Sequence, residues 1–124
     1  MIRILVVFLI TFVYLNALEW KSYENARKLQ KQNNKLIMLD VVRTNCHYCE
    51  TMEKDVLQDK EMSLWLQERF IPVKINLDHG MLPLGLKVSF TPSFFFIDKD
   101  EKIIKKIPGA WDIKDFQSMT KDLK

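Results

Sequence analysis

The sequence predicts an α/β fold, a mixed four-stranded sheet with helices on both faces. Two observations lead to this prediction. Short apolar runs of strand length alternate with longer segments of helical periodicity. The last two apolar runs are separated only by turn residues. Strands separated by helices are typical of parallel pairing, and the closely spaced pair adds an antiparallel edge.

The first half of the chain contains one predicted strand among predicted helices. A helix that ends near residues 33–34 is predicted by apolar side chains at three-residue steps, namely Trp20, Tyr23, Ala26 and Leu29. Residues 36–42 form an apolar run that is typical of a strand buried on both faces. A helix is expected over about 46–57, and Asp59 is expected to cap another that ends near residue 69.

The second half is predicted to complete the sheet. Residues 70–77 read as a strand, and 78–89 as a loop with one short helix, because glycine and proline interrupt that region. Residues 93–97 and 102–107 are predicted to form a hairpin. Asp112 is expected to cap a last helix.

Composition narrows the class of protein. The chain has 124 residues, of which 48% are hydrophobic and 28% charged, so it is long and apolar enough for one globular domain. Its net charge is +3, and the lysines are mixed with acidic residues along the chain. Because no basic block appears, we expect no nucleic-acid partner.

The first 17 residues have the layout of a secretory signal peptide. Arg3 precedes an apolar run over 4–15, and Ala17 stands at the expected cleavage position. The run is shorter than the roughly 20 residues that span a bilayer. We therefore expect a signal peptide over 1–17, a domain over 18–124 and a periplasmic location, with an uncleaved membrane anchor as the alternative.

Cys46-His47-Tyr48-Cys49 contains both cysteines of the chain. In an exported protein this pair meets an oxidising compartment, and no third cysteine exists for a separate structural disulfide. The pair is then either a redox couple or a static ring. A ring this short restricts few unfolded conformations, so a structural role would add little stability. A single motif of two cysteines separated by two residues can also supply half of the ligands of a metal site, and this interpretation remains open.

A redox couple would give the two cysteines different roles. Cys46 is expected at a helix N-terminus, where the helix dipole stabilises a thiolate and makes it the attacking group. Cys49 lies one turn further into the helix, where it can resolve a mixed disulfide. A charged His47 would stabilise the Cys46 thiolate further and make the disulfide more oxidising.

The element order, with the cysteine pair between the first strand and its following helix, resembles the thioredoxin fold over nearly all of residues 19–124. The resemblance rests on four segments in matching order, which are Asp40–Cys46, Lys74–Asp78, Phe90–Ser93 and Ile107–Ala110. It implies that a cis-proline at Pro92 lies opposite the disulfide and presents the backbone of Thr91 to an extended substrate segment.

The same resemblance implies a role for Asp40 and Lys74. A carboxylate inside an apolar strand should have a raised pKa, which suits proton exchange near neutral pH. In thioredoxins the matching aspartate assists deprotonation of the second cysteine, here Cys49. Lys74 matches the lysine that pairs with that aspartate.

The chain also departs from thioredoxin, which has tryptophan at the position of Asn45 and Gly-Pro between the cysteines. Tyr48 and Thr91 are similar to periplasmic disulfide isomerases, and so His47, Tyr48, Thr91 and Pro92 are the expected substrate-binding residues. The segment around Trp20 looks like that of small exported thioredoxin-like proteins and of the redox domain of transmembrane disulfide reductases.

We therefore expect an exported thiol–disulfide oxidoreductase that reduces or isomerises disulfides of periplasmic proteins. Its partners would be exported proteins with cysteines and a membrane thiol electron donor, and it would need no cofactor beyond the Cys46–Cys49 disulfide. A thiol oxidase stays open, because His47 and the oxidising compartment favour it. A copper-binding or cytochrome-assembly module stays open as well. We expect no zinc site, since His47 would point away from a metal held by the cysteines.

Overall fold

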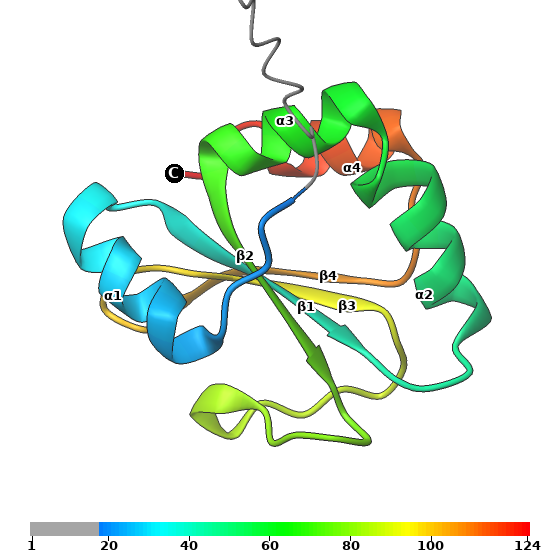
Figure 1. Ribbon diagram of the computed structural model, residues 1–124, viewed down its shortest axis with the longest axis horizontal. Helices are drawn as coiled ribbons and strands as arrows, with labels where there is room; N and C mark the ends of the chain where they lie inside the picture. Colours follow the sequence, from blue (N-terminus) through cyan, green and yellow to red (C-terminus); the bar gives the residue numbers. More distant parts are fainter. Residues whose placement is uncertain (1–17) are drawn as a thin grey trace, which may run out of the picture.

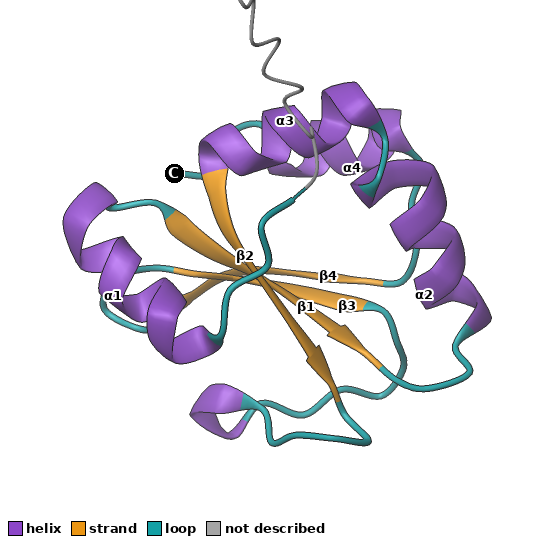
Figure 2. Cartoon of the chain, viewed as in Figure 1, coloured by secondary structure: helices purple, strands orange, loops and turns teal. Residues whose placement is uncertain are grey.

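The computed structural model describes residues 18–124, and the predicted signal peptide, 1–17, lies outside the described residues. The chain forms one sheet with α1 on one face and α2, α3 and α4 on the other (Figures 1 and 2), which confirms the predicted fold class. The elements are α1 Tyr23–Asn33, β1 Leu36–Val42, α2 His47–Met52, π-helix Glu53–Leu57, α3 Lys60–Arg69, β2 Phe70–Asn76, 3₁₀-helix Pro83–Gly85, β3 Ser93–Ile97, β4 Ile103–Pro108 and α4 Ile113–Thr120.

The strand order in the sheet is β2-β1-β3-β4. β1 pairs in parallel with β2, whereas β3 is antiparallel to both β1 and β4. Parallel pairing of helix-separated strands is thus confirmed for β1 and β2 but wrong for β3. The segment between β2 and β3 contains only the three-residue 3₁₀-helix, which is too short to return the chain to the far end of the sheet.

β1 is the central buried strand, as its apolar run predicts. Leu36 and Met38 pack toward α2, α3 and α4, while Ile37 and Leu39 pack toward α1. Because side chains alternate between the two faces of a strand, Asp40 lies on the same face as Met38. The only carboxylate of β1 is therefore placed on the sheet face that α2 covers.

The start of α1 differs from the prediction. Trp20 lies before the helix, because Ser22 caps it by accepting a hydrogen bond from the backbone N–H of Asn25 at 3.1 Å. The backbone N–H of Lys21 donates to the carbonyl of Pro72 at 2.9 Å, so this segment runs beside β2. Trp20 is consequently free to face the β2 side rather than the helix surface.

The helix after the cysteine motif also differs in detail. Cys46 is its N-cap rather than its first residue, and α2 continues into a π-helix over Glu53–Leu57. Asp59 and Asp112 cap α3 and α4 as predicted. No helix within residues 18–124 has the length and apolar character needed to cross a bilayer.

Candidate active site

Cys46 and Cys49 form a disulfide with an S–S distance of 2.10 Å and a Cα–Cα distance of 5.2 Å. The ring lies between the end of β1 and the start of α2. Asn45 precedes it with φ 55°, a left-handed conformation that asparagine tolerates. Cys46 is half-buried, whereas Cys49 is only 8% exposed. An incoming group can therefore reach Cys46 more readily than Cys49.

Two donors approach the sulfur of Cys46. The backbone N–H of Cys49 donates to it at 3.1 Å, and the hydroxyl of Thr91 lies 3.3 Å away. After reduction, the same donors would stabilise negative charge on Cys46, together with the N-terminus of the helix. The geometry thus gives Cys46 the features of an attacking thiolate.

Asp40 is buried beneath this region and is only 2% exposed. Within residues 18–124, its Oδ1 has no hydrogen-bond partner. Burial raises the pKa of Asp40 to about 7, while the charge of Lys74 lowers it and that of Glu53 raises it. A carboxyl with this pKa can both hold and accept a proton near neutral pH.

Lys74 is next to Asp40 in the β1–β2 register, but its ion pair is with another residue. Its Nζ lies 2.7 Å from the Oε2 of Glu53 and 4.1 Å from the ring centroid of Trp20. The expected pairing of Lys74 with Asp40 is therefore corrected: Glu53 takes the direct contact, and Lys74 acts on Asp40 through its charge.

An open cavity of about 450 Å³ joins the disulfide to the Lys74–Glu53 pair. Its lining includes Cys46, Cys49, Glu50, Glu53 and Lys74. Solvent in this cavity therefore meets both the disulfide and the Lys74–Glu53 pair. The arrangement offers a route by which protons can reach the cysteines.

Thr91 and Pro92 stand beside the disulfide. Their peptide bond is cis, and the carbonyl of Pro92 accepts from the backbone N–H of Gly109 at 2.8 Å. The structure thus brings Thr91 to Cys46, as expected. His47 and Tyr48 are both exposed and lie edge to face with ring centroids 5.5 Å apart.

The turn before Cys46 has supporting contacts that sequence reasoning missed. The backbone N–H of Thr44 donates to the Oδ2 of Asp78 at 2.9 Å, and the amide of Asn76 donates to the Thr44 hydroxyl at 3.3 Å. The Thr44 contacts lower the pKa of Asp78. The end of β2 therefore holds the loop that carries the cysteine motif.

Comparison with known proteins agrees with this geometry. The sequence model of the thioredoxin-like domain family matches residues 23–124. The chain belongs to the thioredoxin-like domain family. A Cys46–Cys49 disulfide on this fold supports thiol–disulfide oxidoreductase chemistry at a general level.

Two solved structures show the same fold as this thioredoxin-like domain. The DsbH oxidoreductase has a TM-score of 0.71 and 23% identity, with 85% of this chain and 83% of that chain covered. A thioredoxin from Thermus thermophilus has a TM-score of 0.72 and 24% identity, with 86% and 87% covered.

A curated relative, spermatogenesis-associated protein 20 from Homo sapiens, is 33% identical over 66 residues. The match takes in 49% of this chain but 8% of that protein. The thioredoxin-like domain therefore corresponds to a small part of that relative.

In the described part of this thioredoxin-like domain, no group of three or more histidine, cysteine, aspartate or glutamate side chains is placed to hold a metal ion.

Glu53→Gln is expected to lower the pKa of Asp40 in this thioredoxin-like domain. The variant removes a negative charge that raises that pKa, and it leaves the positive charge of Lys74 in place. Carbon-13 NMR titration of labelled aspartate carboxyls measures the effect. Glu50→Gln, an exposed change in the same cavity, is the matched control. An equal fall in both variants would show that Glu53 has no special coupling to Asp40.

Proposed function

We propose that this chain is an exported thiol–disulfide oxidoreductase that reduces or isomerises disulfides of periplasmic proteins. The observation that carries the proposal is the asymmetric disulfide, in which half-buried Cys46 is bonded to buried Cys49 beside Thr91. An accessible sulfur with an inaccessible partner suits attack on a substrate followed by internal resolution.

The reaction begins with the reduced pair. The Cys46 thiolate attacks one sulfur of a substrate disulfide, a new S–S bond forms, and the other substrate sulfur leaves as a thiolate. The Cys49 thiolate then attacks the sulfur of Cys46 and releases the second substrate thiol. Two electrons have passed to the substrate, and the Cys46–Cys49 disulfide has formed. In isomerisation, a substrate thiol attacks the mixed disulfide instead and regenerates the dithiol.

Asp40 is the proposed proton acceptor for the resolving step. Cys49 is buried, and its thiol must lose a proton before it can attack. Asp40 lies on the sheet face covered by α2 and has a pKa of about 7, so it can take that proton near neutral pH. Lys74, held by Glu53, is a positioning residue that sets the charge next to Asp40.

Thr91 and Pro92 are proposed to form the backbone edge along which a substrate segment binds, called here the substrate edge. The backbone of Thr91 stands close to Cys46, where an extended segment could pair with it like an added strand. His47 and Tyr48 follow Cys46 in the chain and are exposed, and they would flank the same segment.

A membrane thiol donor is the proposed source of electrons. The apolar run in residues 1–17 supports export, and an oxidising compartment would leave the pair as a disulfide without such a donor.

The reduction potential of the Cys46–Cys49 pair tests the direction of electron flow. We expect a value between about −270 and −180 mV, the range of thioredoxin and disulfide isomerases. Equilibration with glutathione redox buffers measures it. A value near about −120 mV belongs to strong oxidants and would replace the proposal by a thiol oxidase. His47→Ala is the companion variant, and a negative shift in its potential would identify His47 as the residue that tunes it.

Insulin reduction separates an enzyme from a binding module. We expect the dithiol protein to reduce insulin repeatedly when a thiol donor is supplied. Failure to reduce insulin, combined with one-to-one binding of copper(I), would support a copper-binding module instead.

A further inference from the structure

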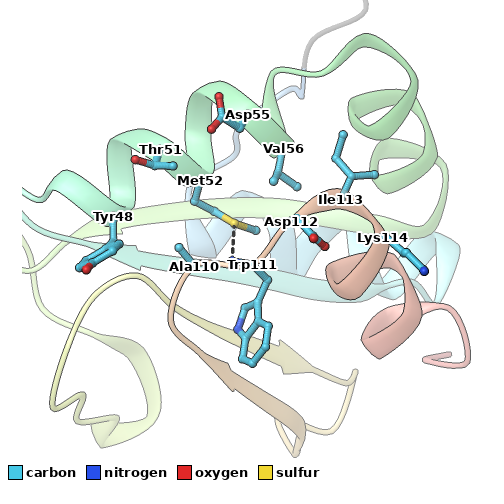
Figure 3. A pocket seen from close by; sticks show the side chains of 10 residues that line it. All are labelled: Tyr48, Thr51, Met52, Asp55, Val56, Ala110, Trp111, Asp112, Ile113 and Lys114. Carbon is cyan, nitrogen blue, oxygen red and sulfur yellow. Dashed lines mark hydrogen bonds between the residues drawn. The ribbon is translucent and has the colours of Figure 1, made fainter.

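A groove of about 600 Å³ runs from Tyr48 along α2 to the start of α4 (Figure 3). It is separate from the cavity that contains the two cysteines. Two links connect it to the reacting sulfur. Tyr48 lies between Cys46 and Cys49 in sequence. Gly109 directly precedes Ala110, which lines the groove, and the N–H of Gly109 donates to the carbonyl of Pro92. One end of the groove thus begins at the proposed substrate edge.

The groove has an apolar floor and two exposed rings. Met52 and Val56 form buried parts of its lining. Trp111 is fixed by two hydrogen bonds, from its Nε1 to the carbonyl of Pro108 at 2.9 Å and from its backbone N–H to the sulfur of Met52 at 3.5 Å (Figure 3). The Trp111 side chain is nevertheless 41% exposed and Tyr48 is 66% exposed. Both rings therefore have surface available to a ligand.

The charges on the groove are mainly negative. Asp55 stands on the α2 side and Asp112 on the α4 side. One oxygen of Asp112 accepts from the backbone N–H of Asp115 at 2.8 Å. Within residues 18–124, the Asp55 carboxylate makes no hydrogen bond or ion pair. Among the described lining residues Lys114 is the cation, and it lies at the end away from Tyr48 with its ammonium pointing outward.

We propose that this groove binds a lysine or arginine side chain of the substrate, close in sequence to the cysteine that reacts with Cys46. The aliphatic stem would lie on Met52 and Val56, and the charged end would meet the acidic rim and an aromatic face. This specificity rests on the proposed function, because it presumes that Cys46 attacks a polypeptide disulfide.

Matched peptides test the proposal. Each contains one cysteine joined by a disulfide to 5-thio-2-nitrobenzoate. The Cys46 thiolate attacks the peptide sulfur, the peptide becomes attached to Cys46, and the coloured thiolate leaves. One series places arginine, norleucine or glutamate one to three residues from the cysteine, and a second moves the arginine six residues away. Release of the coloured thiolate by the full chain with Cys49→Ala gives the rate constant.

The arginine peptide is expected to react about tenfold faster than the glutamate peptide, since an ion pair and a cation–π contact each contribute modestly at an exposed site. Norleucine should fall between them, and the distant arginine should lose the advantage. The double variant Asp55→Asn/Asp112→Asn should reduce the ratio of the arginine rate constant to the glutamate rate constant, and Asp55→Lys should reduce this ratio further. Asp100→Lys, which makes the same two-unit charge change on the exposed turn before β4, should preserve it.

The outcomes distinguish this inference from the proposed function. Equal rates for all peptides would overturn the cationic groove and leave the oxidoreductase standing. A distant arginine that works as well as a near one would also overturn it, because general charge attraction would then explain the preference. No reaction with any peptide would contradict the proposed function itself.

Discussion

Cys46→Ala is expected to abolish disulfide reduction, with a loss of at least about a thousandfold in the rate of insulin reduction. Cys46 is the sulfur that both an incoming group and the donors from Cys49 and Thr91 can reach. Cys49 is 8% exposed and cannot take over the attack unless the structure around it opens. The fold should persist, because Cys46 is half-buried and its ring is short.

Cys49→Ala is the matched variant and should behave in the opposite way. Cys46 still attacks, but no internal thiol resolves the product, so a mixed disulfide accumulates. Non-reducing gels and mass spectrometry would detect the adduct and its site. Captured partners would then identify the substrates. If Cys46→Ala formed the adduct on Cys49 as readily, the assignment of attacking and resolving roles would be wrong.

Local patterns were sufficient to predict much of this molecule. The buried character of β1 follows from seven consecutive residues, and the caps of α3 and α4 follow from single aspartates before helical segments. Thr91 was placed beside Cys46 by resemblance to thioredoxin, and the two side chains do meet in space. Such features depend on short segments or on a known fold, so sequence alone can reveal them.

Contacts between distant segments were not predictable in the same way. Glu53 reaches Lys74 from the π-helix, 21 residues away in sequence, and Trp20 reaches the same ammonium from the strand-like segment before α1. A periodic pattern placed Trp20 on a helix, but it could not show that Ser22 would cap that helix first. The contact between Glu53 and Lys74 depends on how the π-helix packs into the core on that face of the sheet, which no local signal in the chain specifies.

The buried carboxyl of Asp40 should make stability depend on pH. Its pKa is about 7 in the folded protein, against 3.8 as the ordinary value. Between these values the folded state holds a proton that the unfolded state has lost, so the free energy of unfolding falls as pH rises from about 4 to about 7. A shift of this size corresponds to a loss on the order of 4 kcal/mol.

Asp40→Asn is therefore expected to stabilise the oxidised protein at pH 8 by up to about 4 kcal/mol and to have little effect near pH 4. Urea unfolding at both pH values measures the difference. Asp78→Asn is the control with the opposite sign, because the Thr44 contacts lower the pKa of Asp78 and stabilise its ionised form. That variant should lose stability at pH 8 relative to low pH.

The same Asp40→Asn variant should slow the release of substrate from the Cys46 mixed disulfide at neutral pH, because asparagine cannot accept the proton of Cys49. Attack by Cys46 should change much less, so the mixed disulfide should build up transiently. Rapid-quench measurement of both steps separates them. If the variant were more stable but the mixed disulfide were resolved at an unchanged rate, Asp40 would be a buried charge without a role in proton transfer. If the variant resolved the mixed disulfide more slowly but the wild-type protein showed no pH dependence of its unfolding free energy, a group other than Asp40 would be the one that titrates.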